Sequence, residues 1–317
     1  MPKRILRKIK TIGRCLKTAF KDWDSRMPFA SSAVLAYYAI FSLPGLLVII
    51  INVAGYFFGK EAVTNQITNQ VQGVTGRDTA AFIQNVVANA SISGGSWLST
   101  ILGIATLLFG ATGVFYHVQQ IFNKIWEVKL KPKPKQKFLK LLKDRLFSFG
   151  LILVIGFLLL ISLVVSAGIT ALSHWVAQHL SPAVLVLFRL LDFLVSISII
   201  TILFAAMYRY LPDAEIEWKD VWPGALLTTI LFVIAKYLLG LYFGKSDPAS
   251  TYGAAGSVIL IMLWVSYSGL ILLFGAEFTR VYANRSGHRK IKPSEIAESA
   301  RTDSKSGFGS KQKEMTN

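Results

Sequence analysis

The feature that most constrains this chain is a series of long stretches without a single charged residue. An ionised side chain at the centre of a bilayer costs about 2.5–3.5 kcal/mol even on insertion scales, so spanning segments exclude such residues. A span needs about 20 mainly apolar residues. Six stretches contain no charged residue, at residues 27–59, 79–123, 146–188, 193–208, 221–235 and 248–276.

These stretches predict helices rather than strands. Spanning strands are about 10 residues long and alternate apolar with polar positions, whereas a run such as residues 149–165 is apolar throughout. Hydrophobic residues make up 53% of the chain and charged ones only 16%, against about 25% charged in soluble domains. We predict an all-α polytopic membrane protein with six transmembrane helices, at residues 31–58, 98–119, 146–170, 184–208, 221–243 and 256–279.

Lysine and arginine collect on alternate connectors of these spans. One set of connectors and termini carries 29 of the 34 basic residues and the opposite set carries 3. Because basic residues are retained on the cytoplasmic side, we expect both termini to be cytoplasmic and the number of spans to be even.

The same distribution bears on the partners. The net charge of +17 is typical of nucleic-acid-binding proteins, but topology alone explains most of it, so no nucleic acid is expected. The expected partners are the lipid bilayer and anionic lipid headgroups at the cytoplasmic face. The sequence leaves a homo-oligomer open.

Outside the spans, three segments have a distinct composition. Residues 1–30 alternate basic and apolar positions with helical spacing and predict an amphipathic helix at the inner interface. Residues 59–97, between the first two spans, predict short amphipathic helices on the outer side. Residues 284–317 are polar and rich in serine and lysine, which favours disorder. The membrane domain is then 31–283, and the single Cys15 excludes an internal disulfide.

Catalytic motifs are sparse. The four histidines are scattered along the chain, whereas a zinc hydrolase needs clustered His and carboxylate ligands. Carboxylates do cluster between the fourth and fifth spans, where they are typical of a solvated loop or, less often, of a divalent-cation site. The sequence predicts no enzyme, no metal site and no cofactor. The clustered carboxylates are Asp213, Glu215, Glu217 and Asp220.

Ionisable residues inside spans are the stronger signal, because they are costly and usually face the bundle interior. Arg189 and Asp192 lie three residues apart in the fourth span, so they share a helix face and can pair. Lys236 lies inside the fifth span. Glu277 and Arg280 at the inner end of the sixth span are expected to form an interfacial pair.

Helix geometry adds further candidates. Pro44 lies within the first span, where proline removes a backbone hydrogen bond and kinks the helix. Gly240 and Gly244 form a small-xxx-small pair that predicts close helix packing in the fifth span. Trp264 lies near the middle of the sixth span, where it packs or lines a cavity.

Four segments carry a resemblance to a known family. They read SSAVLAYYAIFSLPGLL (31–47), GATGVFYHVQQIFNKIWEVK (110–129), YRYLPDAEIEWKDVWPGAL (208–226) and STYGAAGSVILIMLWVSYSGLILLFGAEFTRVYA (250–283). In this order they resemble the YihY/virulence factor BrkB family of bacterial inner-membrane proteins. The resemblance implies a six-span helical protein of the bacterial plasma (inner) membrane. Positions within these segments to test are Tyr37, Tyr38, Pro44, Asn123, Trp126, Pro212, Tyr252, Gly253, Trp264 and Glu277.

Members of that family have been labelled ribonuclease BN, a function that the residues do not favour. The leading hypothesis is transport or translocation of an amphiphilic or anionic envelope component such as a lipid. A non-transporting scaffold or assembly factor is the alternative, and a tRNA-processing ribonuclease the third. The residues proposed for the pathway or for helix packing are Pro44, Arg189, Asp192, Lys236, Tyr252, Gly253, Trp264 and Glu277.

Overall fold

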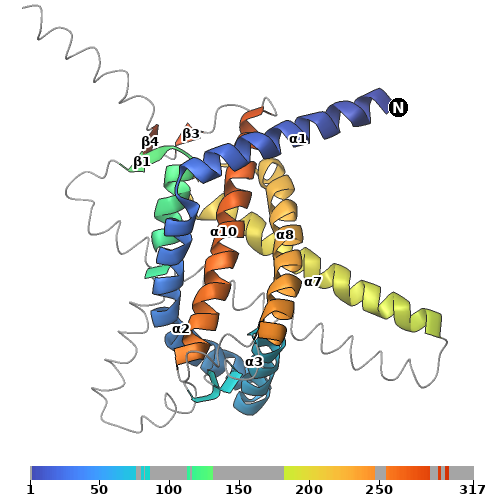
Figure 1. Ribbon diagram of the computed structural model, residues 1–317, viewed down its shortest axis with the longest axis vertical. Coiled ribbons are helices and arrows are strands. Elements are labelled where there is room, and N and C mark those ends of the chain that lie inside the picture. Colours follow the sequence, from blue (N-terminus) through green and yellow to red (C-terminus); the bar gives the residue numbers. More distant parts are fainter. Residues whose placement is uncertain are drawn as a thin grey trace, which may run out of the picture.

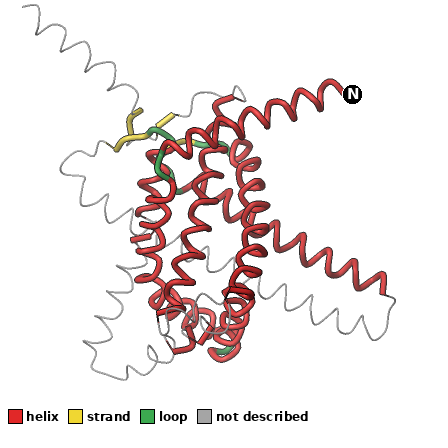
Figure 2. The backbone as a smooth tube through the Cα atoms, viewed as in Figure 1, coloured by secondary structure: helices red, strands yellow, loops and turns green. Residues whose placement is uncertain are grey.

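The computed structural model is built from long helices (Figures 1 and 2). It describes residues 2–75, 80–81, 83–85, 113–114, 116–130, 182–246, 255–285, 292–293 and 297–299. Residues 116–125 form a further helical stretch. The long helices are α1 (Pro2–Ser25), α2 (Pro28–Phe58), α3 (Lys60–Thr75), α7 (Pro182–Tyr210), α8 (Trp218–Ser246) and α10 (Gly256–Arg285).

Helix α10 is the centre of the arrangement and packs against α2, α8 and α1. Figure 1 shows α2, α10 and α8 running side by side, while α1 crosses α10 and α8 at one end and α3 lies at the other. The N-terminal half of α7 diverges from the bundle, and its C-terminal half contributes Phe204, Ala205 and Tyr208 to the main hydrophobic core. The crossing of α1 therefore defines one end of the bundle, which we call the α1 end.

Four of these helices coincide with predicted spans, namely α2, α7, α8 and α10, and each extends the predicted range by a few residues. Helix α1 matches the predicted amphipathic N-terminal helix, and α3 lies in the segment predicted to be amphipathic on the outer side. Most of the predicted span 98–119 and all of 146–170 lie outside the described residues. Six spans and cytoplasmic termini stay predictions.

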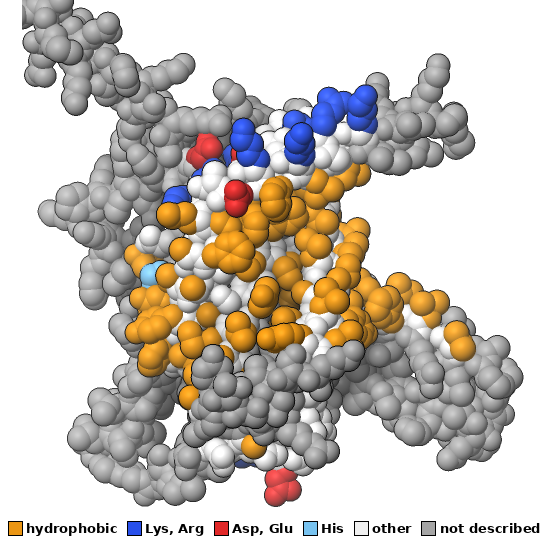
Figure 3. Space-filling view, in the orientation of Figure 1, with side chains coloured by type: hydrophobic (Ala, Val, Ile, Leu, Met, Phe, Trp, Pro, Cys, Tyr) orange, Lys and Arg blue, Asp and Glu red, His pale blue; other side chains and the backbone are white. Residues whose placement is uncertain are grey.

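Apolar side chains form an outward-facing belt between the two ends. Figure 3 shows hydrophobic side chains covering the visible face below α1, with Lys and Arg gathered along α1 itself. Three described segments are long and apolar enough to cross a membrane, Phe193–Tyr210, Trp218–Tyr242 and Gly256–Arg285, yet only 22%, 22% and 39% of their most apolar windows are buried inside the protein. A bilayer is the solvent that such a surface requires.

Helices α8 and α10 approach closely through two glycines. A methyl group at Gly224 of α8 would overlap Thr279 of α10, and one at Gly275 of α10 would overlap Thr228 and Tyr208. The buried hydroxyl of Tyr208 contacts Thr228 Oγ1 at 2.8 Å and donates to the carbonyl oxygen of Leu272 at 3.0 Å. Small residues and satisfied hydroxyls are the features by which membrane helices associate.

The predicted glycine contact at Gly240 is not seen. A methyl group placed on Gly240 would meet no described atom within 4 Å. The close approach of α8 is instead at Gly224, about four and a half turns nearer the α1 end. Spacing alone does not reveal which side of an all-apolar helix meets its neighbour, because such a helix has no polar face to orient it.

Two short antiparallel sheets lie at the α1 end. Strand β1 (Val128–Leu130) pairs with β4 (Ala297–Ser299), and β2 (Ala214–Glu215) pairs with β3 (Lys292–Pro293). Strands β3 and β4 are part of the tail for which the composition favours disorder. At these five residues the chain is instead ordered by backbone pairing, because β1 and β2 supply free strand edges.

We predict opposite effects for alanine at the two contrasting glycines. Gly275→Ala forces a methyl group into the Tyr208–Thr228 contact and should destabilise the protein by about 1–3 kcal/mol. Gly240→Ala meets no described neighbour and should be neutral or stabilising by up to about 1 kcal/mol through helix propensity. Thermal unfolding of both variants in detergent, followed by tryptophan fluorescence, measures the difference. Equal melting temperatures would contradict the proposed close approach.

Candidate functional site: a buried ion network beside an apolar groove

Two residues with left-handed backbone flank the ion network. Met27, between α1 and α2, has φ 53°, and Glu127, just after the helical stretch 116–125, has φ 56°. This conformation is uncommon for residues other than glycine and costs of order 1–3 kcal/mol, so surrounding contacts must hold it. The two turns place Arg26 and Glu127 side by side, with Arg26 Nη2 3.5 Å from Glu127 Oε1.

Glu277 is the centre of the network. Its side chain is only 1% exposed, although it lies on the apolar helix α10. Arg280 Nε donates to Glu277 Oε2 at 2.9 Å, and Arg26 Nε lies 2.5 Å from Glu277 Oε1. A buried carboxylate is tolerated only when it is paired in this way, because each ion loses several kcal/mol of hydration.

The two arginines extend the network to other parts of the chain. Arg280 Nη2 donates to Asp22 Oδ2 of α1 at 2.6 Å, and Arg280 Nη1 lies 3.4 Å from Glu127 Oε1. Arg26 Nη1 donates to the carbonyl oxygen of Lys124 at 2.7 Å. The network therefore joins α1, the segment 124–127 and α10, which are up to 258 residues apart. These ion pairs hold α1 across the end of α10.

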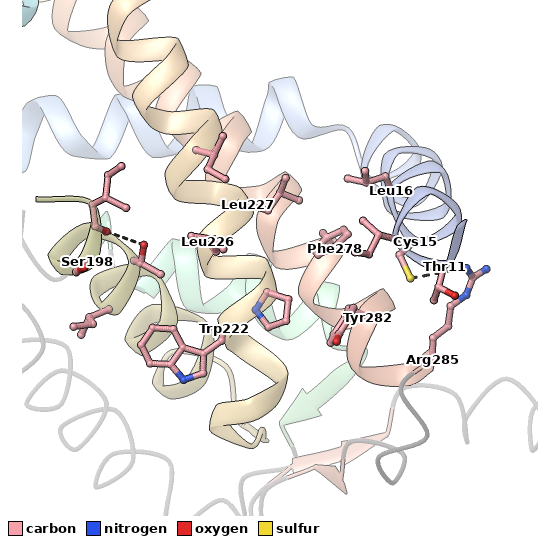
Figure 4. Close-up of a pocket in the computed structure, with 16 residues that line it drawn as sticks. Thr11, Cys15, Leu16, Ser198, Trp222, Leu226, Leu227, Phe278, Tyr282 and Arg285 are labelled. Atoms are coloured by element: carbon pink, nitrogen blue, oxygen red, sulfur yellow. Dashed lines mark hydrogen bonds between the residues drawn. The ribbon is translucent and has the colours of Figure 1, made fainter. Parts of the chain in front are cut away.

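Beside this network, α1 forms one wall of an apolar groove of about 1160 Å³ (Figure 4). The volume is slightly larger than the roughly 300–1,000 Å³ that is typical of small-molecule pockets. Helices α7, α8 and α10 form the other walls. The lining residues are Thr11, Ile12, Cys15, Leu16, Ile197, Ser198, Thr201, Ile202, Trp222, Pro223, Leu226, Leu227, Ile230, Phe278, Tyr282 and Arg285.

The groove is open at the protein surface. Its lining includes five residues that are 40–48% exposed, two of them Leu226 and Ile230 of α8. From Trp222 to Ile230 it follows eight residues of α8, or about 12 Å of helix rise. The groove thus reaches from the α1 end into the apolar belt.

Most of the groove wall is apolar, and two of its hydroxyl groups already donate to backbone carbonyl oxygens. Ser198 Oγ donates to the carbonyl oxygen of Leu194, and Thr201 Oγ1 to that of Ile197, so these hydroxyls bond to their own helix. Among the described residues that line the groove, Arg285 alone is charged. Figure 4 shows Arg285 near Thr11 and Cys15, on the opposite side of the groove from Ser198 and Trp222.

The residues singled out in the sequence do not all lie at one site. Glu277 and Arg280 form the expected pair, but within a larger buried network. Lys236 is exposed on α8, and Trp264 is half-buried with its ring 5.9 Å from that of Phe232. Neither Lys236 nor Trp264 lines the groove.

The remaining proposed residues are only partly described. Arg189 and Asp192 belong to α7, and Pro44 belongs to α2, which is one helix through that position; the side chains of all three lie outside the described parts. Tyr252 and Gly253 lie outside the described residues altogether. Their pathway and packing roles stay predictions.

The acidic loop between α7 and α8 is held by neighbouring residues. Asn123 Nδ2 donates to Asp213 Oδ2 at 2.8 Å, and the backbone N–H of Asp213 donates to Asn123 Oδ1 at 2.8 Å. Glu217 forms an exposed ion pair with Lys219. In the part of the chain that is described, no group of three or more His, Cys, Asp and Glu residues is placed to hold a metal ion.

Sequence reasoning missed Asp22, Arg26 and Glu127 as partners of Glu277, and Arg285 as a groove residue. One available signal was that Glu277 and Arg280 end the last charge-free stretch together, as a pair of opposite charges. Nothing local connects that pair to residues around positions 22–26 or 127.

We predict that Glu277→Gln strongly lowers the free energy of unfolding, because it removes the carboxylate of α10 that pairs with the buried guanidinium of Arg280. Breaking a buried pair typically costs about 3–5 kcal/mol. Glu61→Gln is the matched control, because Glu61 is an exposed acid in the first turn of α3, and its melting temperature should stay near that of the wild type. Thermal unfolding in detergent compares the two, and a Glu277→Gln protein as stable as the control would argue against the network.

Comparisons with known proteins agree with this architecture. The family model described as virulence factor BrkB matches residues 19–299. A UPF0761 membrane protein of Saccharophagus degradans is 26% identical over 86% of this chain and 60% of its own length. A relative of the same description from Stenotrophomonas maltophilia is 25% identical over 81% of this chain and 57% of its own. One from Xanthomonas oryzae is 27% identical over 84% and 59%.

The chain spans about three-fifths of the length of these curated relatives. No solved structure matches it. The relatives are described as membrane proteins, in agreement with the apolar helices found here. Because the family model covers most of the sequence, this chain belongs to the virulence factor BrkB family of membrane proteins.

Proposed function

We propose that this protein moves an amphiphilic component of the bacterial envelope, such as a lipid, along the groove between α1, α7, α8 and α10. The observation that carries the proposal is the groove itself, which is open, apolar along its wall and charged at one corner. A substrate with an apolar chain and an anionic head fits this distribution. No enzymatic step is part of the proposal.

The location of the groove supports the same reading. It begins at the α1 end, where Trp222 lies in the first turns of α8, and indole rings favour the headgroup level of a bilayer. It continues beside exposed apolar residues of α7 and α8, such as Ile202 and Ile230. A lipid would reach the groove sideways from the membrane, without first passing through water.

The proposal places the α1 end at the cytoplasmic face of a bacterial inner membrane. Helix α1 has Lys10, Arg14 and Lys17 exposed, while Cys15 and Ala19 are buried against the bundle. A helix with one basic and one apolar face lies in the interface plane and binds anionic headgroups. The charge asymmetry of the connectors supports the same orientation.

A scaffold or assembly role is the second candidate, favoured by the exposed basic face of α1, which also fits an acidic partner protein. The two candidates differ in whether the groove matters. Narrowing the groove should leave a scaffold intact and should stop a transporter.

We predict that Leu226→Trp, which fills the groove from α8, lowers lipid movement in proteoliposomes to near the protein-free background. Leu238→Trp is the matched control, because Leu238 is also an exposed leucine of α8 but lies outside the groove. Fluorescent lipid placed in one leaflet and quenched by dithionite measures the movement. A wild-type protein without activity above background, or two variants with equal activity, would count against transport through this groove.

A further inference from the structure

The charge at the groove mouth indicates which amphiphile it binds. Arg285 is the last residue of α10, and its guanidinium reaches only neutral partners. Nη1 lies 3.9 Å from Cys15 Sγ, and Nη2 donates to Thr18 Oγ1 at 3.4 Å. In contrast, Arg26 and Arg280 each contact two carboxylates or more. Within the described parts of the chain, no carboxylate lies within ion-pair distance of Arg285.

The neighbouring basic residues do not share this position. On a helical wheel at 100° per residue, Lys10 and Lys17 of α1 point away from the face formed by Thr11, Cys15 and Leu16 that lines the groove, and Arg14 lies at the edge of that face, about 60° from Thr11. None of these three basic residues lines the groove. Among the described residues that line the groove, the positive charge that a ligand meets is therefore the charge of Arg285.

Polar and apolar groups are separated along the groove. Thr11, Tyr282 and Arg285 lie together at the side formed by α1 and the end of α10 (Figure 4). Leu226, Leu227 and Ile230 of α8 line the part that continues into the apolar belt. A ligand that satisfies both parts has an anionic head at Arg285 and a hydrocarbon chain along α8.

Guanidinium groups favour phosphate for geometric reasons. Arginine presents five N–H donors in a planar fork that binds two phosphate oxygens at once, and it is less strongly hydrated than lysine. Among the described residues, only the two long contacts to Cys15 and Thr18 use these donors, which leaves most of the fork for a ligand.

We propose that the groove is a binding site for an anionic phospholipid, with the phosphate held by Arg285 and one acyl chain lying along α8 between Trp222 and Ile230. The ligand comes from the leaflet at the α1 end. This inference rests on the proposed function for its groove, but it concerns binding and headgroup choice rather than movement, so the two can fail separately.

Binding is tested with the purified full-length protein in nanodiscs of phosphatidylcholine. The probes are phosphatidylglycerol and phosphatidylcholine that carry a photoreactive diazirine on one acyl chain, and the readout is the amount of lipid crosslinked to peptides containing residues 222–230. Both lipids carry a phosphate, but in phosphatidylcholine a trimethylammonium group neutralises it and repels a guanidinium. Wild-type protein should therefore take up phosphatidylglycerol about tenfold better than phosphatidylcholine.

Three variants locate the preference. Arg285→Gln should lower phosphatidylglycerol crosslinking about tenfold, to the level of phosphatidylcholine, while Arg285→Lys keeps part of it. Lys219→Gln removes an exposed basic residue outside the groove and should retain the full preference. Melting temperatures of all variants separate this effect from a purely structural role of Arg285 at the helix end.

The outcomes are distinct. Equal labelling of the two lipids in wild-type protein, or a preference that survives Arg285→Gln, would overturn the inference even if lipid movement continues. A preference that depends on Arg285 in a protein that moves no lipid would support the site and refute transport. Labelling that Leu226→Trp leaves unchanged would show that the lipid lies outside the groove.

Discussion

The arrangement at the α1 end depends on the burial of one charge. Glu277 lies on a helix surrounded by apolar residues, and its carboxylate is stable there because Arg26 and Arg280 approach it from different segments. A buried charge without partners costs several kcal/mol, so the segments that supply the partners are not free to move apart. The same contacts hold Met27 and Glu127 in the left-handed conformation of the two turns that this pairing requires.

The groove follows from the same constraint. Asp22 of α1 contacts Arg280, and seven residues earlier Cys15 is buried in a small cluster with Phe278 and Val281 of α10. These two contacts keep α1 across the bundle rather than along it, and α1 in that position closes one side of the groove. The polar network and the apolar site are thus parts of one structure.

The elements were predictable from the sequence, and their contacts were not. Charge-free stretches located α2, α7, α8 and α10, because the bilayer excludes charge wherever a helix crosses it. The pair Glu277–Arg280 was predictable from its spacing of three residues. Asp22, Arg26 and Glu127 were not, since partners 153 to 258 residues apart leave no local pattern. For the same reason Lys236 and Trp264 stood out as rare residues within spans, whereas the groove residue Arg285 stood in a basic tail.

The most direct test of this account uses the only cysteine of the chain. Cys15 is buried between α1 and α10, so a maleimide labels it only when α1 separates from the bundle. Asp22→Asn removes a charged contact worth about 1.5 kcal/mol or more, and Asp24→Asn changes an exposed acid on the same helix. The account predicts that Cys15 is labelled about tenfold faster in Asp22→Asn than in wild type or Asp24→Asn. Equal labelling rates in all three proteins would contradict it.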